Sequence, residues 1–268
     1  MISLWRTSSR AALALLTLLL PLAGAALTGS VQVTPGGKTH GHDRVSSAGV
    51  VVWLEAEDHR PKAAAAPRAV RMVQQRKQFV PHLLAIPVGT TVEFPNFDPI
   101  FHNAFSNIDG QPFDIGLYPP GSTRRVLFRR PGVVRMFCNI HQSMSAIIVV
   151  APTPWIAISD RNGTFSLEGV EPGSYTLHFF HERATGQTLD ALTRRIEIPV
   201  GSLALPAIQV SETGYIEMPH RNKYGQDYGP PPDDATPYRK AKLQPPARSR
   251  CAGNSSASHP CRWWCCSW

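Results

Sequence analysis

The chain has 268 residues, 43% of them hydrophobic and 17% charged, which allows one or two packed cores, while its 25 prolines exclude long helices. The formal net charge of +8 is uneven: residues 61–150 hold ten Lys or Arg and four Asp or Glu, whereas residues 151–218 hold four and eight. The absence of any recognition-helix pattern argues against a nucleic-acid-binding protein. The basic middle segment either attracts an acidic partner protein or is an ordinary solvated face.

The first 25 residues have the pattern of a secretory signal peptide. Arg6 and Arg10 precede an apolar run over residues 11–22, and Ala-Gly-Ala at 23–25 follows as a cleavage site. The run is about 12 residues long, short of the roughly 20 that a spanning helix needs, so we expect cleavage and no membrane span afterwards. The sequence therefore predicts a periplasmic or otherwise exported protein.

Residues 29–60 predict two strands, SVQV at 30–33 and the β-branched and aromatic run GVVVWL at 49–54. His40 and His42 lie between them. These two histidines could bind one metal ion, but nothing nearby completes a coordination set, and a solvated turn is the simpler interpretation. A Pro/Ala connector at residues 61–68 then marks a boundary.

From residue 69 to residue 151 the pattern is all β. A strand at 79–88 is interrupted by prolines, as edge strands are, and a Gly-Thr turn leads from it into the alternating strand 91–94. A turn-rich loop at 95–105 carries His102. Further strands are expected at 124–128, 133–137 and 145–150, and Cys138 follows the second of these directly.

Three potential metal donors lie within FCNIHQSM, residues 137–144. Cys138, His141 and Met144 have Cys-x2-His-x2-Met spacing, and Cys138 is the only cysteine before residue 251. In an oxidising compartment a lone cysteine has to be protected, buried or bound to a metal. Together with His102, the set matches a His2Cys copper site with a weak axial Met. Zinc is one alternative, and core packing of Met144 beside an ordinary loop histidine is another.

Residues 69–151 resemble a cupredoxin of the plastocyanin and amicyanin kind. The features shared with that family are the strand entered through Gly89-Thr90-Thr91-Val92, the pair His102-Asn103, Gly132 six residues before Cys138, and the tight Cys-x2-His-x2-Met loop. One departure is that Asn139-Ile140 stands where the family commonly has a proline between the cysteine and the second histidine.

The resemblance implies a Greek-key β-sandwich that holds one type 1 copper ion. His102, Cys138 and His141 would be the strong ligands and Met144 the weak axial ligand. Asn103 would tie the two ligand loops together. His141 would reach the surface within an apolar patch through which electrons pass.

Residues 152–212 resemble the carboxypeptidase regulatory-like, transthyretin-like β-sandwich. They contain Asp-x-x-Gly-x-Phe at 160–165 and Pro-Gly-x-Tyr at 172–175, and residues 29–60 loosely match the opening strands of that family. We therefore predict that the cupredoxin domain is inserted into, or joined to, this second sandwich. Insertion requires the strand at 50–54 to pair with a strand beyond residue 152. His178 and His181 are expected to have ordinary surface or core roles.

Residues 213–268 form a basic, Pro-rich tail that we expect to be disordered. It contains Cys251, Cys261, Cys265 and Cys266. The last three of these, with His259, could bind a metal or form disulfides, although the abrupt Cys/Trp-rich ending favours a non-functional extension.

The sequence thus predicts an exported, all-β, mononuclear copper protein that carries electrons between redox partner proteins by Cu(I)/Cu(II) cycling. The alternative is a copper storage, delivery or structural module without electron transfer. A copper enzyme is disfavoured, because Cys138 is flanked by Phe137 and Asn139 instead of the His-Cys-His of multicopper oxidases, and no catalytic residue is assigned. The sequence names neither electron donor nor acceptor.

Overall fold

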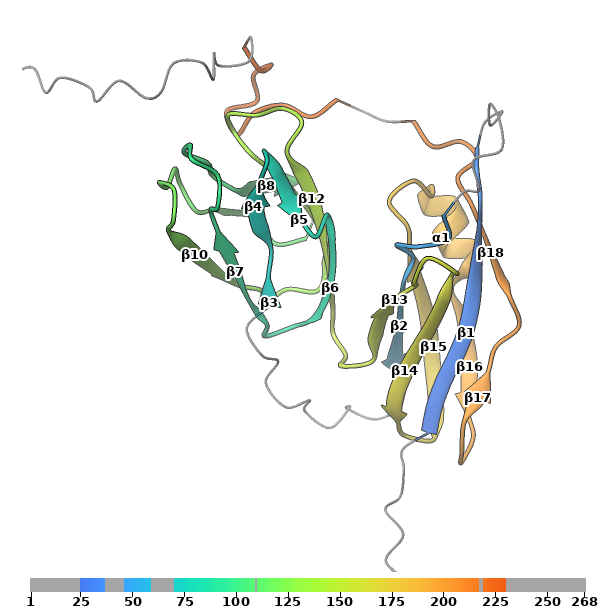
Figure 1. Ribbon diagram of the computed structural model, residues 1–268. Coiled ribbons are helices and arrows are strands. Elements are labelled where there is room, and N and C mark those ends of the chain that lie inside the picture. The colour runs from blue at the N-terminus through green and yellow to red at the C-terminus, as the bar shows by residue number, and fades with distance from the viewer. Residues whose placement is uncertain (1–24, 37–45, 59–69, 109, 217–218, 230–268) are drawn as a thin grey trace, which may run out of the picture. The chain divides into compact units, whose positions relative to one another are not determined.

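The computed structural model describes residues 25–36, 46–58, 70–108, 110–216 and 219–229 (Figure 1). The predicted signal peptide up to residue 24, His40, His42 and the cysteine-rich C-terminus lie outside the described residues. Within the described part of the chain, no helix is long and apolar enough to cross a membrane. The elements are strands apart from α1 (Gly186–Leu192), so the all-β prediction is confirmed.

Two sheets enclose a first hydrophobic core. One contains β14 (Thr164–Val170), β1 (Ala25–Thr34), β17 (Leu203–Ala204) and β18 (Ile208–Ser211), and the other contains β13 (Ile156–Ile158), β2 (Val51–Ala56), β15 (Gly173–Phe180) and β16 (Arg194–Ile198). Alternate side chains of β14 and β15 point inward, among them Phe165, Leu167, Tyr175 and Leu177, because successive residues of a strand face opposite sides. This core is therefore built from chain segments that precede residue 60 and follow residue 152.

Insertion of one domain into the other requires the strand at 50–54 to pair beyond residue 152, and β2 does so. Trp53 lies opposite Ile156 of β13, and Leu54 lies opposite Leu177 of β15, both in antiparallel register. In the other sheet β1 pairs with β14 and, in parallel, with β17 and β18. The chain thus begins these two sheets, makes the strands of residues 70–151, and then returns.

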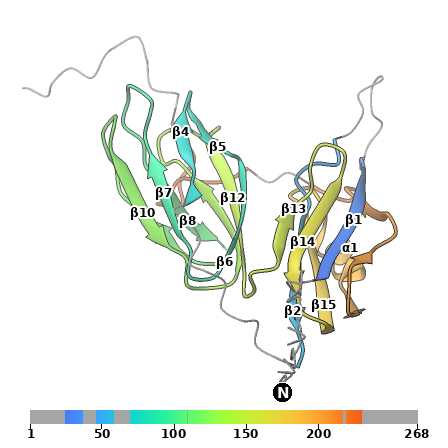
Figure 2. The same ribbon diagram turned by 60° about the horizontal axis from the view of Figure 1, so that its bottom comes forward.

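Residues 70–151 form a second pair of sheets around a core of their own. One sheet has the order β10-β7-β3 and the other β6-β12-β11-β8-β9, and β4 (Val73–Gln75) pairs with β5 (Gln78–Val80). Figures 1 and 2 show β10 and β7 on one side and β6 and β12 on the other. The bounds are β3 (Val70–Arg71), β6 (Leu83–Pro87), β7 (Thr91–Pro95), β8 (Phe105–Ile108), β9 (Phe113–Asp114), β10 (Thr123–Leu127), β11 (Gly132–Phe137) and β12 (Ser145–Ala151).

In this second pair of sheets, the strand that contains a proline lies at an edge and the most apolar strand lies inside. β6, which ends in Pro87, lies at the edge of its sheet, where a missing N–H costs no ladder hydrogen bond. β12 lies inside the sheet, and all its residues after Ser145 are buried. Met136, Ile148 and Phe94 are among the fully buried side chains of this core.

The register of β11 positions the donor-bearing loops. Phe137 lies opposite Ser145 of β12, so residues 138–144 form the short connection between two adjacent strands. The N–H of Cys138 closes this connection by donating to the carbonyl of Met144 at 3.0 Å. On its other side β11 pairs with β8, with Phe137 opposite Phe105, which brings the loop that carries His102 beside Cys138.

Gly163 provides a test of the sheet that joins β1 to β14. Its φ is +82°, and an added Cβ would lie 2.0 Å from the carbonyl oxygen of Val31. At Gly169 φ is +68°, but an added Cβ would meet nothing within 4 Å. We expect Gly169→Ala to lose about 1–2 kcal/mol of unfolding free energy from backbone strain alone. Gly163→Ala should lose clearly more, because β1 must also move away. Urea unfolding checks this, and equal losses would contradict the β1 packing.

Candidate metal centre

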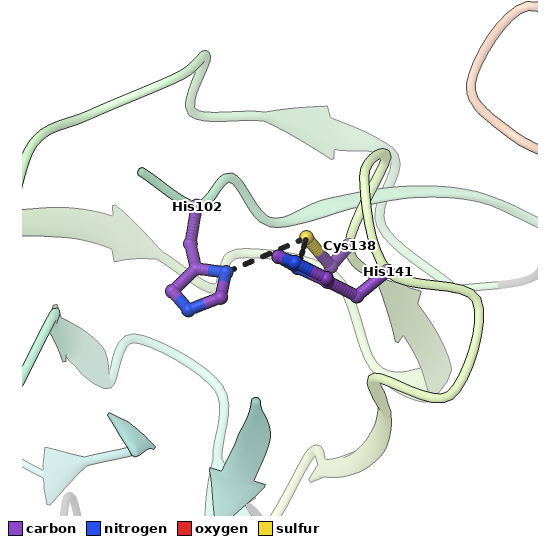
Figure 3. Close-up of side chains that lie close together, drawn as sticks. All are labelled: His102, Cys138 and His141. Atoms are coloured by element: carbon purple, nitrogen blue, oxygen red, sulfur yellow. Dashed lines mark hydrogen bonds between the residues drawn. The ribbon is translucent and has the colours of Figure 1, made fainter. Parts of the chain in front are cut away.

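Three side chains meet inside the second core: His102, Cys138 and His141. The Nδ1 atoms of the two histidines lie 3.9 Å and 3.8 Å from the Cys138 sulfur, respectively. One potential ligand atom from each residue lies within 4.8 Å of the others. His102 and Cys138 are fully buried and His141 is 7% exposed. Figure 3 shows both imidazole rings turned toward the sulfur.

The spacing of these donors fits a single metal ion. Metal–imidazole and metal–thiolate bonds of about 2.0 Å and 2.3 Å, at 120° to each other, place the two donors about 3.7 Å apart. The observed separations of 3.8 and 3.9 Å are close to this value. A thiolate with two imidazoles is a soft donor set, which suits copper in both of its common oxidation states.

Met144, the fourth predicted donor, lies on the same short loop. It is fully buried and belongs to the same hydrophobic cluster as Cys138. Its N–H donates to the carbonyl of His141 at 3.1 Å, and its own carbonyl accepts from Cys138. These contacts hold the backbone of Met144 beside Cys138 and His141, and its role as axial ligand stays a prediction.

Asp98 orients His102 from outside the donor set. His102 Nε2 lies 2.8 Å from Asp98 Oδ2, and with the proton on Nε2 the Nδ1 lone pair is free to face the sulfur. The carboxylate also accepts backbone N–H bonds from Arg76 at 2.5 Å and Lys77 at 2.8 Å. Asp98 was not predicted from the sequence; its signal was an acidic residue four positions before the histidine in the same loop.

Burial and charge set the protonation of this cluster. Burial lowers the pKa of His102 and outweighs the opposing effect of Asp98. Burial also lowers the pKa of His141 to about 4, with His102 and Lys77 adding to the effect. Burial would raise the pKa of Asp98, but the hydrogen bonds from Lys77, His102 and Arg76 bring it below its ordinary value. Both imidazoles are therefore neutral at neutral pH, which is the form that binds metals.

The surroundings of His141 differ from what the resemblance implied. We expected this side chain to reach the surface, but it is buried, and its Nε2 has no hydrogen-bond partner among the described residues. Asn103, in contrast, makes the link that was expected of it: its Oδ1 accepts from the N–H of Asn139 at 2.6 Å. That bond connects the loop of His102 to the loop of Cys138.

A segment near the C-terminus also contacts the ligand loop. Residues 219–229, which we call the strap, fall in the tail predicted to be disordered, yet they make defined contacts. The hydroxyl of Tyr228 donates to the carbonyl of Cys138 at 2.8 Å, and the N–H of Lys223 donates to Asn139 Oδ1 at 3.0 Å. The His220 ring stacks on Phe137 with centroids 4.0 Å apart. Its sequence signal was three ring-bearing side chains at intervals of four residues, His220, Tyr224 and Tyr228.

The other described histidines of the first core do not join a metal centre. His178 stacks on Trp53 and lies 3.4 Å from a Glu55 carboxylate oxygen, while His181 lies 4.0 Å from Glu212. Among the residues that the structure describes, only His102, Cys138 and His141 form a cluster of three or more His, Cys, Asp or Glu with metal-binding spacing.

Similar solved structures are copper proteins. A copper-containing nitrite reductase from Thermus scotoductus SA-01 is 34% identical over 34% of this chain, with TM-score 0.31, and the match spans 25% of that reductase. A purple cupredoxin from Nitrosopumilus maritimus is 24% identical over 31% of this chain and 99% of its own, with TM-score 0.28. Amicyanin from Paracoccus versutus is 18% identical over 37% of this chain and 97% of its own, with TM-score 0.29.

No protein-family model and no curated protein matches the chain. What the site can do chemically follows from its own donors, their burial and their spacing.

Asp98 offers a test of how the site is supported. We expect Asp98→Ala to weaken copper binding by about tenfold to a hundredfold, because His102 loses the group that fixes its ring and its tautomer. Affinity is measured by competition with a copper chelator. Glu93→Ala is the matched control, since that carboxylate bonds Arg71 and Arg125 instead. Equal affinities of the two variants would show that Asp98 does not support the site.

Proposed function

We propose that the chain is an exported mononuclear type 1 copper protein that carries electrons between redox partner proteins. The observation that carries this proposal is the convergence of two buried imidazole Nδ1 atoms on one buried cysteine sulfur. In this proposal His102, Cys138 and His141 are the strong ligands and Met144 is the axial ligand.

The donor set suits electron transfer because it can serve both oxidation states. Bound copper would supply one-electron chemistry, and a thiolate with two imidazoles stabilises Cu(I) and Cu(II) alike. The chain's part is to keep the donors in one arrangement and away from water. Two ligands share one short loop, the third is held by Asp98, and the exposed fraction of all three is 7% or less.

The proposed domain organisation follows the strand pairing. We assign residues 69–151 to a cupredoxin domain, and residues 29–60 with 152–212 to a regulatory-like sandwich into which that domain is inserted. Support comes from the separate cores and from β2, whose two partners among the described strands, β13 and β15, both follow residue 152. Residues 1–25 are proposed as the signal peptide of an exported, periplasmic protein.

An acidic redox partner is part of the proposal. Arg124, Arg125, Arg129 and Arg130 are exposed at and just after β10, in the part of the chain where basic residues outnumber acidic ones. Exposed arginines attract an acidic protein surface and speed its approach. Glu93 engages Arg125, so Arg124, Arg129 and Arg130 are the better candidates.

Copper titration of the purified mature protein tests the function. We expect one equivalent to bind with an intense visible absorption band that disappears on reduction and returns on oxidation. Cys138→Ala and His102→Ala should lose the band, because each removes a strong ligand. Copper that binds without colour or redox cycling would contradict the carrier and favour a storage, delivery or structural role. Consumption of nitrite or dioxygen would instead indicate an enzyme.

A further inference from the structure

The strap, residues 219–229, bonds to the ligand loop at three oxygen atoms. Tyr228 and Lys223 bond Cys138 and Asn139 as described above, and His220 Nε2 lies 2.8 Å from the carbonyl oxygen of Gln142. Other polar groups of the loop are hydrogen-bonded within it: the N–H of Cys138 donates to the carbonyl of Met144, and the N–H of Met144 donates to the carbonyl of His141. The strap thus engages the acceptors that the loop's own turn does not use.

The strap has an ordered structure of its own. The Asn222 side-chain oxygen accepts from the N–H groups of Tyr224 and Gln226, and the Asn222 carbonyl accepts from Gly225, whose φ of +76° permits the turn. Lys223 Nζ adds a contact of 2.8 Å to Asp114 of β9. The strap is therefore fastened both to the ligand loop and to the sheet beside it.

Tyr228 and His220 form the part of the strap nearest the cysteine. The Tyr228 hydroxyl lies 3.3 Å from His220 Nδ1, and the two rings meet edge to face at 84°. His220 in turn stacks on Phe137, the residue before Cys138, at an interplanar angle of 22°. These contacts restrain Phe137, which precedes Cys138, and the carbonyl group of Cys138 itself.

The ligand loop contains no proline between its two donors, so the contacts with the strap are a source of rigidity for it. Asn139-Ile140 lies between Cys138 and His141, so no proline ring stiffens the segment that joins these two donors. Asn139 is instead held from two sides: its N–H bonds Asn103, and its side-chain oxygen accepts from Lys223. Hydrogen bonds from another segment therefore take the place of a rigid residue within the loop.

We propose that the strap braces the ligand loop and slows the exchange of its bound metal, with Tyr228 and His220 as positioning residues. A metal held by Cys138 and His141 cannot leave while the loop keeps its shape, and opening the loop requires the strap's hydrogen bonds to break. The metal's identity as copper rests on the proposed function, whereas the bracing of the loop does not.

The first test measures copper release. Tyr228→Phe keeps the ring and removes only the hydroxyl that donates to Cys138. We expect transfer of Cu(I) from this variant to an excess of bathocuproine disulfonate to be about fivefold faster than from the wild type, the effect of about 1 kcal/mol for one hydrogen bond. The control is Tyr224→Phe on the same strap, because Tyr224 is 69% exposed and packs beneath Lys223 Nζ. Equal release rates for wild type and Tyr228→Phe would overturn the proposal.

The second test uses the copper-free protein. Amide hydrogen exchange at Asn139 and Met144 should be faster in Tyr228→Phe and in His220→Ala than in the wild type. Exchange at Val31, whose N–H donates to the carbonyl of Gly163 and which belongs to the other core, should be unchanged, and this separates bracing of the loop from a loss of global stability. Unchanged exchange at Asn139 and Met144 in both variants would overturn the bracing role. Since no metal is needed, a failure of the copper function leaves this test intact.

Discussion

The pairing of β11 with strands on both sides is the constraint on which the metal centre depends. Its register with β12 leaves seven residues to connect the two strands, and its register with β8 fixes the loop that carries His102. The β11–β12 register is regular over six residue pairs, and a slip of one residue would turn the apolar side chains of β11 to the other face of the sheet. The β11–β8 pairing is shorter and contains an irregularity between Arg135 and Phe137, next to the loop that carries His102. The donors thus meet where these two pairings end.

Burial then sets the chemistry of the donors. Desolvation disfavours charged imidazole, and it outweighs Asp98 at His102 and brings the pKa of His141 to about 4. Asp98 keeps its charge because two backbone N–H groups and His102 donate to it. The result is a buried site whose two imidazoles are neutral at neutral pH, with one outer carboxylate that orients a ring without competing for the metal.

The ligand loop is stabilised from several sides. Asn103 holds it from the neighbouring loop, the Cys138–Met144 bond closes it, and the strap engages its outward-facing oxygens. Each bond contributes about 0.5–1.5 kcal/mol, and together they limit how far the sulfur and the two nitrogens can move. A site whose donors move little needs little rearrangement when its metal gains or loses an electron, which links the packing of the loop to the proposed function.

The sequence by itself determined the all-β class, the edge position of the strand that ends in Pro87, and the three residues that cluster in the structure, His102, Cys138 and His141, because strand alternation, prolines and donor spacing are local properties. The strand predicted over residues 79–88 is two strands, β5 and β6, and Met144 as a fourth donor stays a prediction. The sequence also led to the expectation that residues 50–54 pair with a strand beyond residue 152, and β2 does pair with β15. Tertiary structure alone decided the burial of His141, the support of His102 by Asp98 and the contacts of residues 219–229. These depend on which surfaces meet in space, and composition cannot show that a polar, Pro-rich stretch finds unused hydrogen-bond acceptors far away in the chain.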